Sequence, residues 1–349
     1  MNFCLLLISL VSALLSDQRA ELVFAGDAMM HQSQIDDARS GKQYDFSDYF
    51  RDIKGFVDSA DYAIVNLETP VAGAPYSGYP CFNAPESYAD ALKDAGFDLF
   101  MLANNHMLDR RDKGLISTLN YLDEKKIPHI GAYRTGEERD TLTPHIVDVN
   151  GFKIALLNYT FSTNGILPSG KVIVNPLDKQ MISRDIHASR EHGAELVAVM
   201  PHWGIEYVDL PPAHVKAMCE FIRSLGVDMI IGGHPHVVQP MKMLDNPTDS
   251  SRRQLVVYSM GNFISGMKTV KTRGGAMVKV FISRDSMGKA QVDSAGYRLV
   301  YTVPPGIDKH RPGYHLVYPS DSVPDSRARD FRSAAEVLFN RHNIAVNPL

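Results

Sequence analysis

Cysteine is scarce in this sequence. Only Cys4, Cys81 and Cys219 occur among 349 residues, and no two have the C-x-x-C spacing of a thiolate metal site or a redox pair. Cys4 falls in an apolar run at the N-terminus, which leaves two cysteines for the remainder of the chain. The sequence therefore implies no disulfide framework and no cysteine-based metal site. We interpret Cys81 and Cys219 as small buried apolar residues.

An excess of positive charge is also missing. The chain carries 36 basic and 40 acidic residues, for a net charge of −4, and has no Lys/Arg-rich run with interleaved aromatics. This balance argues against a nucleic-acid partner. Neither a Walker-type loop nor a G-x-G-x-x-G segment is present, so a nucleotide held by a glycine loop is not supported. With 44% apolar residues, the chain can bury a sizeable core.

Long apolar runs are missing except at the N-terminus. Residues 3–15 are almost wholly apolar, and the polar residues 16–19 end the run. This length is short for a bilayer span and suits the core of a signal peptide. We predict an export signal over residues 1–19, with an uncleaved short anchor as the alternative. Either reading places the protein outside the cytoplasmic membrane, as a periplasmic or membrane-associated protein.

Short apolar runs alternate with amphipathic runs between residues 20 and 235. The apolar runs predict strands at 21–27, 61–70, 97–106, 194–204 and 227–236. The amphipathic runs predict helices at 47–59, 85–95, 111–126, 177–191 and 211–225. Asn150-Gly151 between two apolar segments predicts a hairpin over 145–160. This alternation indicates an α/β core with a largely parallel sheet and added antiparallel hairpins.

The pattern changes after residue 250. Successive strands are predicted at 253–263, 274–283 and 289–300, followed by a stretch rich in proline and glycine over 303–324 and a helix over 326–341. We therefore expect one domain over 20–300. The segment 301–349 is expected to be a C-terminal extension whose helix packs on that domain.

Five of the predicted strands end in a cluster of polar side chains. These clusters are, in order, Asp27 with His31; Glu68; Asn104, Asn105 and His106 with Asp109; His202 with Glu206 and Tyr207; and His234 with His236. Ligands of open α/β sheets bind beyond the carboxyl ends of the strands, so these clusters are expected to converge. Imidazole and carboxylate ligands suit Zn, Mn or Fe. Taken singly, each residue has a simpler interpretation as a turn or cap. Their joint occurrence favours a site with one or two divalent ions.

The segment I-G-G-H-P-H, residues 231–236, ends the fifth of these strands. We expect Gly232 and Gly233 to let the chain turn sharply off the sheet. Pro235 would stiffen the link between the two histidines, so that His234 and His236 face different metal positions.

Six segments, in order, resemble the motifs of CapA-type capsule biosynthesis proteins. These are the poly-γ-glutamate synthesis proteins with a calcineurin-like metallophosphoesterase fold. The segments are GDAMMH, NLETP, NNHMLD, HWGIEY, GGHPHVVQP and YSMGNF, and the resemblance runs from about residue 21 to 300. The resemblance implies a four-layer α/β/β/α sandwich of the metallo-dependent phosphatase type with mixed sheets, and two metals at the strand ends.

The resemblance also implies residue roles. The first metal would be held by Asp27 and His236, the second by Asn105, His202 and His234, and Glu68 would bridge them, while His106 would act as an acid near the leaving group. The sequence departs from the family's pattern at two places. Met29 stands where the family's Asp-x-His has histidine, with His31 two residues later, and Glu68 is one methylene longer than the usual aspartate. A one-metal site is therefore an alternative.

The chemistry implied is hydrolytic. A pair of divalent ions would activate a water for attack on phosphorus or on a carbonyl carbon. His106 would protonate the leaving group, and Asp109 would orient its imidazole or, alternatively, cap the next helix. Further candidates for polar substrate contact are Asn104, Glu206, Tyr207, Gln239 and Asn262.

The leading hypothesis is a CapA-like protein of capsule or poly-γ-glutamate biosynthesis with a metal-dependent phosphoesterase-type site, acting as a hydrolase. Its partners would be an anionic polymer or a phosphate-bearing substrate, together with membrane-bound capsule synthesis proteins. One alternative is a metallophosphoesterase for a small phosphate ester, and another is a non-catalytic envelope scaffold. The net charge does not steer an anion, so metals or local arginines such as Arg110, Arg111 and Arg273 would have to attract it. Solvated surface charge is the simpler reading of these arginines.

Overall fold

The computed structural model describes residues 18–349. The predicted export signal falls almost wholly outside this range, and Arg19, its last residue, already belongs to strand β1 (Arg19–Ala28). No helix within residues 18–349 combines the length and the apolar character needed to span a bilayer.

The first of two large sheets is mixed and has nine strands. Its main path runs β18–β17–β16–β1–β4–β5–β6, and β15 and β19 pair at the sides of β1 and β17. The bounds are β4 Tyr62–Leu67, β5 Leu99–Met101, β6 His129–Ile130, β15 Asn262–Ile264, β16 Gly274–Arg284, β17 Ala290–Val303, β18 His315–Val317 and β19 Val346–Pro348. Strands β1, β4, β5 and β6 are parallel, whereas β16 and β17 form an antiparallel ribbon beside β1.

The second sheet has six strands in the order β13–β14–β12–β11–β9–β8. Its strands are β8 His145–Val149, β9 Phe152–Thr160, β11 Leu196–His202, β12 Met229–Ile231, β13 Met241–Asn246 and β14 Asp249–Val257. The four inner strands are parallel, and the hairpin predicted about Asn150-Gly151 is confirmed as β8–β9. Two further pairs are small: β2 (Arg39–Ser40) with β3 (Gln43–Tyr44), and β7 (Ala132–Tyr133) with β10 (Ile173–Val174).

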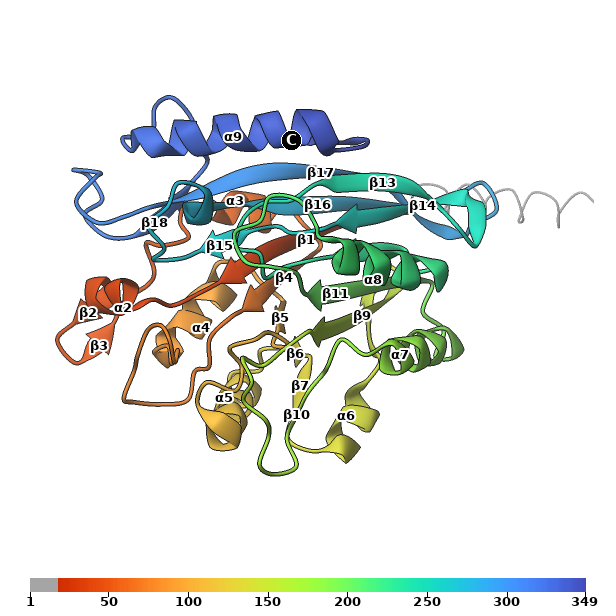
Figure 1. The fold of residues 1–349 in the computed structure, drawn as a ribbon, viewed down its shortest axis with the longest axis horizontal. Helices are drawn as coiled ribbons and strands as arrows, with labels where there is room; N and C mark the ends of the chain where they lie inside the picture. Colours follow the sequence, from red (N-terminus) through yellow and green to blue (C-terminus); the bar gives the residue numbers. More distant parts are fainter. Residues whose placement is uncertain (1–17) are drawn as a thin grey trace, which may run out of the picture.

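The two sheets share one apolar core, and helices cover their outer faces (Figure 1). Along β1, Leu22 and Phe24 face the core between the sheets, while Val23 and Ala25 face the helices, as the two-residue period of a strand requires. On the first sheet lie α2 (Gln32–Ala38), α3 (Lys54–Val57), α4 (Glu86–Asp94) and α5 (Arg111–Glu124). On the second lie α7 (Lys179–Glu191) and α8 (Ala213–Ser224). The predicted four-layer α/β/β/α sandwich is thus confirmed.

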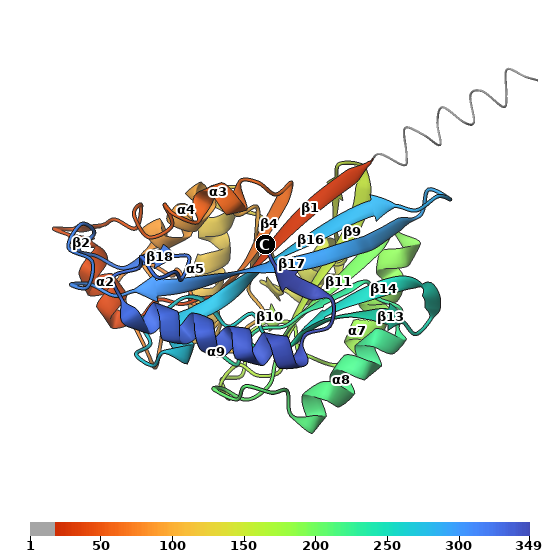
Figure 2. The ribbon, with the colours of Figure 1, turned by 90° about the horizontal axis from the view of Figure 1, so that it is seen from above.

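The C-terminal helix α9 (Ser326–His342) runs along the β16–β17 ribbon (Figures 1 and 2). Phe339 meets Tyr297 edge-on, with ring centroids 4.7 Å apart, and Phe331 lies against Tyr301 at 5.9 Å. These aromatic contacts join α9 to the core between the sheets. Beyond α9, β19 pairs with β17 and returns the chain end to the first sheet.

Several sequence predictions need correction. The strand predicted over 253–263 is two strands, because the chain leaves the second sheet at Val257 and enters the first at Asn262, turning at Gly261 with φ +69°. The segment predicted as a helix over 47–59 is mostly a series of tight turns, and only Lys54–Val57 is helical. Helix α6 (Gly136–Leu142) was not predicted. Cys219 is buried as predicted, but Cys81 is exposed.

Candidate metal centre

The carboxyl ends of parallel strands from both sheets meet at one edge of the sandwich. Five segments bring polar side chains there: Asp27 on β1, Glu68 after β4, Asn104 to His106 after β5, His202 at the end of β11, and His234 with His236 after β12. Backbone pairing fixes this convergence, since Asp27 pairs with Asn66 of β4 and Asn262 of β15, and His202 pairs with Gly233. All of these side chains are buried.

The backbone of the G-G-H-P-H turn differs from the expectation for its glycines. The positive φ angles belong to the histidines, +95° at His234 and +57° at His236, and not to Gly232 or Gly233. The glycines are needed for close approach. A Cβ at Gly232 would stand 2.2 Å from the Tyr258 carbonyl oxygen, and one at Gly233 2.9 Å from Asp27 Oδ1. Strained backbone at non-glycine residues is characteristic of functional sites.

The Asp27 carboxylate is held by contacts at both of its oxygens. Asn66 Nδ2 donates to Asp27 Oδ1 at 2.8 Å, and the His234 backbone N–H donates to Oδ2 at 3.1 Å. His236 Nδ1 lies 3.3 Å from the same Oδ2. Burial alone would raise the pKa of Asp27, but the hydrogen bond to His236 and the charges of the neighbouring histidines hold it well below its usual value. Asp27 is therefore a carboxylate at neutral pH.

Glu68 is buried yet has no hydrogen bond. Neither of its carboxylate oxygens has a hydrogen-bond partner among the described residues. His202 Nε2 lies 3.6 Å and His236 Nε2 lies 3.8 Å from Oε1, and His234 Nδ1 is likewise buried without a partner among the described residues. Burying a polar group without a hydrogen-bond partner costs free energy, unless a bound ion or molecule supplies the missing contact.

Three overlapping groups of side chains could each hold a metal ion. Within residues 18–349 these are Glu68–His202–His234, Asp27–Glu68–His236, and Glu206–His234–His236, each with ligand atoms within 4.8 Å of one another. The first two share Glu68, the carboxylate without hydrogen bonds. Buried carboxylates and neutral imidazoles at this spacing are the donors that Zn, Mn and Fe use. The donor set therefore fits a divalent metal ion.

An amide side chain contacts each of two histidines, Asn105 at the His202 nitrogen that faces Glu68 and Asn262 at the His236 nitrogen that does not. Asn105 Oδ1 lies 2.9 Å from His202 Nε2, and Asn262 Oδ1 lies 2.9 Å from His236 Nδ1. The amide nitrogen of Asn262 donates to the Thr272 carbonyl at 2.8 Å, so both ends of this side chain are engaged within the protein. Asn262 was predicted to contact substrate, but its position is behind His236, where it fixes the ring orientation.

His106 and Asp109 form a buried pair at the edge of the cluster. His106 Nδ1 lies 2.8 Å from Asp109 Oδ2, which also accepts the backbone N–H of Phe82 at 2.7 Å. The Phe82 ring meets the imidazole edge-on at 4.5 Å between centroids. The alternative role of Asp109 as a helix cap is not seen, since Arg110 is the N-cap of α5. The pair leaves His106 Nε2 free to exchange a proton.

The remaining predicted site residues lie around this cluster in different ways. His31 Nδ1 accepts the Gly266 N–H at 3.1 Å, and burial followed by the charge of His236 lowers the pKa of His31 to about 4. Asn104 Nδ2 bonds to Asn66 Oδ1 and the Leu67 carbonyl, so Asn104 braces the neighbouring strand end. Gln239 Nε2 donates to the Val208 carbonyl at 2.6 Å, holding the loop that carries Glu206 and Tyr207.

The arginines considered for attracting an anion differ in exposure. Arg111 is exposed and Arg110 is half-buried, at the start of α5. Arg273 is buried, donates to the Met267 carbonyl through Nε and lies 3.8 Å from Asp325. Arg273 is therefore paired inside the protein and does not offer a surface charge.

Two functional residues escaped the sequence analysis. Asn66 donates to Asp27 from within β4, and Asn164 Oδ1 accepts a hydrogen bond from Asn105 Nδ2 at 3.2 Å. The signal for Asn66 was available, because it is the one polar residue inside the apolar run A-I-V-N-L at 63–67. Asn164 lies in a polar loop, where nothing in the local pattern distinguishes it.

Comparison with known proteins gives consistent matches. The family model for "Bacterial capsule synthesis protein PGA_cap" matches residues 21–267. The chain is 30% identical over 294 residues to the capsule biosynthesis protein CapA of Bacillus anthracis, covering 79% of this chain and 67% of that protein. It is 26% identical over 292 residues to the PGA biosynthesis protein CapA of Bacillus subtilis strain 168, covering 79% and 71%.

Among solved structures, the NAD nucleotidase of Haemophilus influenzae has a similar fold. The TM-score is 0.52 at 13% sequence identity, and the match covers 94% of this chain but only 57% of the nucleotidase chain. At this identity the likeness concerns the fold alone. It agrees with the four-layer sandwich described above.

Proposed function

The chain belongs to the PGA_cap family of bacterial capsule synthesis proteins, and on that premise we propose that it acts in capsule polymer synthesis as a metal-dependent hydrolase. The observation that carries the catalytic part is Glu68, a buried carboxylate without hydrogen bonds that faces the imidazoles of His202 and His236. A residue in this state is suited to a cation and poorly suited to an empty core.

Two positions for divalent ions share Glu68. Asp27 and His236 complete one of them, and His202 and His234 complete the other, with Asn105 beside His202. A bound divalent ion would supply Lewis acidity, polarising an oxygen of the substrate. The protein's part is to hold these ligands in place. Asn66 steadies Asp27, and Asn262 steadies His236.

His106 is the proposed proton donor to the leaving group. Asp109 holds its Nδ1, which leaves Nε2 to deliver a proton, and the Phe82 ring packs against the imidazole and limits its rotation. Asp109 acts here through His106 and is a positioning residue.

The proposed substrate is an anionic capsule polymer or a phosphate-bearing precursor of it, and the relatives' names point to poly-γ-glutamate. Because the net charge is −4, attraction of an anion falls to the bound cations and not to the overall field of the protein. We further propose that the protein works in the cell envelope, outside the cytoplasmic membrane, beside membrane-bound synthesis proteins.

The test combines metal content with a polymer phenotype. The purified chain is expected to hold one or two divalent ions, and His202→Ala to lose metal and fail to restore capsule polymer in a deletion strain. His214→Ala, a matched change at an exposed histidine of α8, should behave as the wild type.

Three results would contradict the proposal. Retention of metal and polymer by His202→Ala would exclude the metal centre. A protein that binds metal and restores polymer, yet cleaves neither polymer nor a generic phosphodiester with Mn²⁺, Zn²⁺ or Fe²⁺, would be a scaffold. Rapid turnover of a small phosphate ester without any polymer phenotype would instead indicate a general phosphoesterase.

A further inference from the structure

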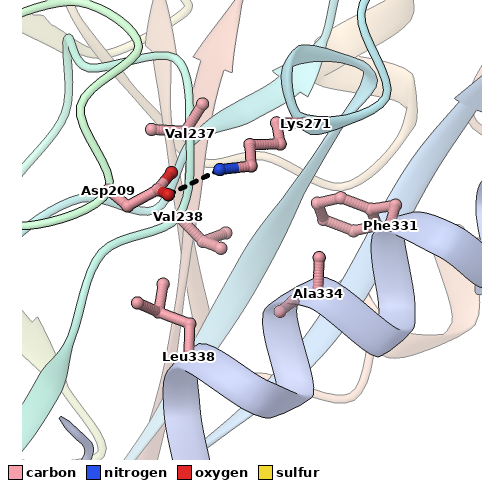
Figure 3. Close-up of a pocket in the computed structure, with 8 residues that line it drawn as sticks. Asp209, Val237, Val238, Lys271, Phe331, Ala334 and Leu338 are labelled. Atoms are coloured by element: carbon pink, nitrogen blue, oxygen red, sulfur yellow. Dashed lines mark hydrogen bonds and ion pairs between the residues drawn. The ribbon is translucent and has the colours of Figure 1, made fainter.

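Glu206 lies on the loop 203–212 that connects β11 to α8, and three contacts hold this loop at the residues directly after Glu206. The Tyr207 backbone N–H donates to the Pro235 carbonyl at 2.8 Å, so the loop is bonded to the residue between the two histidines. Gln239 holds the Val208 carbonyl, and Lys271 pairs with Asp209 beside helix α9 (Figure 3). The loop is therefore held in one position over the H-P-H turn.

The backbone around Glu206 is strained. Tyr207 has φ +66°, an unfavourable value for a residue with a side chain, and Gly204 has φ +104°. The Tyr207 ring lies against the His236 ring at 6.1 Å between centroids. Conformations of this kind persist when the surroundings enforce them, as the three loop contacts do here.

This geometry brings the Glu206 carboxylate to the two histidines. One oxygen of Glu206 and one nitrogen each of His234 and His236 lie within 4.8 Å of one another. Glu206 is half-buried, whereas Asp27 and Glu68 are fully buried, so it approaches the histidines from the solvent side.

Within residues 18–349, the segment 27–31 contributes Asp27 alone to the three candidate metal groups. Met29 stands where the family's pattern has histidine, and the Nδ1 of His31 is already occupied by the Gly266 N–H. Apart from Asp27 and Glu68, the carboxylate grouped with His236 in the described range is Glu206, and its group contains His234 in place of Asp27 and Glu68.

We propose that Glu206 is a metal ligand, which binds an ion together with His234 and His236 and closes the centre on its solvent side. This inference rests on the proposed metal-dependent function. A carboxylate in place of an imidazole makes the donor set harder and adds a negative charge, so this position should favour Mn²⁺ over softer ions more than an imidazole-rich site would.

The test measures Mn²⁺ binding and, separately, Zn²⁺ binding by titration calorimetry on the full chain after removal of metal with a chelator. Glu206→Gln should weaken one binding step at least tenfold, and Glu206→Asp should weaken it less, because the charge remains. Glu124→Gln, the same change at an exposed residue of α5, should leave binding as in the wild type. Melting of the metal-free variants is measured alongside, to separate loss of a ligand from loss of the fold.

The outcomes separate this inference from the function on which it rests. Wild-type affinity and stoichiometry in Glu206→Gln would overturn the role of Glu206 while leaving the metal centre intact. A wild-type chain that binds neither Mn²⁺ nor Zn²⁺ would overturn both. Equal weakening of Mn²⁺ and Zn²⁺ binding supports ligation without a preference, and greater weakening of Mn²⁺ supports the harder donor set as well.

Discussion

At the scale of single residues, we expect Glu68→Gln to change the thermal stability of the protein in opposite directions with and without metal. The Glu68 carboxylate is buried without a hydrogen bond, so Glu68→Gln removes a charge that is costly to bury. In the presence of chelator, we expect the variant to unfold at the same or a higher temperature than the wild type, with a gain of up to about 2 kcal/mol. With Mn²⁺ present, the order should reverse, because a ligand shared by both positions is lost.

The measurement is thermal unfolding in chelator and in saturating Mn²⁺. A variant that is strongly destabilised in chelator would show that Glu68 is satisfied by the protein itself. The comparison with His214→Ala, which lies outside the cluster, controls for general effects of substitution.

The sequence identified most residues of the cluster but not what each one does. Strand-end position was enough to bring Asp27, His202 and His236 together, because parallel strands align their carboxyl ends. The role of Asn262 could not be read in the same way. Whether an amide faces a ligand or the back of a histidine depends on the direction of a buried side chain, which β15 sets through its pairing with β1.

At the scale of elements, a buried charge network joins α6, β9 and α7. Arg139 is 3% exposed, pairs with Asp185 and bonds Asn175 Oδ1 at 2.7 Å, while Tyr159 donates to the same Asp185 at 2.9 Å. Arg139→Met should lower the free energy of unfolding by about 3–5 kcal/mol, because Asp185 is left buried without its partner. Chemical denaturation measures this. Lys113→Met, on the exposed face of α5, should change stability little, and an equally small effect of both changes would contradict the prediction.

A second ion pair joins the two sheets at the end away from the metal centre. Arg284 of β16 binds Glu195, just before β11, at 2.6 Å, and also the Gly151 carbonyl of the β8–β9 hairpin. Burial alone would raise the pKa of Glu195, but the hydrogen bonds from Arg284 and Lys153 lower it below its usual 4.5. The stabilisation is therefore present above about pH 4.5 and is lost as the pH falls through the lower folded value.

Because the pKa of Glu195 is lower in the folded state, we expect Glu195→Gln to lower the free energy of unfolding by about 2 kcal/mol at pH 7. The loss should become progressively smaller below pH 4. Urea unfolding at a series of pH values measures the difference. If the difference in unfolding free energy between the wild type and Glu195→Gln stayed constant down to pH 3, the pKa of Glu195 would not change on folding. Glu191→Gln, in an exposed pair with His187, serves as the control.

The ends of helices and strands were harder to predict where one continuous apolar run contributes to more than one element. Residues 253–263 look like one strand, yet the chain passes from the second sheet to the first within them. The crossing occurs at Gly261, which cannot carry a side chain because Val238 N and the Gly274 carbonyl lie 3.0 and 3.2 Å from where its Cβ would be. The run 46–57 spaces its apolar residues as a helix would, but successive tight turns put the same side chains into the core.

At the scale of the whole molecule, metal binding should stabilise the fold. An ion that binds only the folded chain adds about 2.7 kcal/mol at a concentration 100 times its dissociation constant. For a domain of this size, we expect a rise of about 5 °C in the melting temperature, reversed by chelator. The shift should shrink in His202→Ala. No change with Mn²⁺, Zn²⁺ or Fe²⁺ would indicate that the folded chain holds no ion.

The pairing of Asp27 with Asn262 has a consequence for how the protein is made. These two residues are far apart in the sequence but are neighbours in one sheet, and Asp27 also binds the His234 backbone, 207 residues away. A growing chain cannot assemble the cluster until residue 262 has left the ribosome, and pairings this remote form late in folding. Since ions are selected in cells largely by what is available, the compartment in which folding finishes would decide which metal the protein acquires.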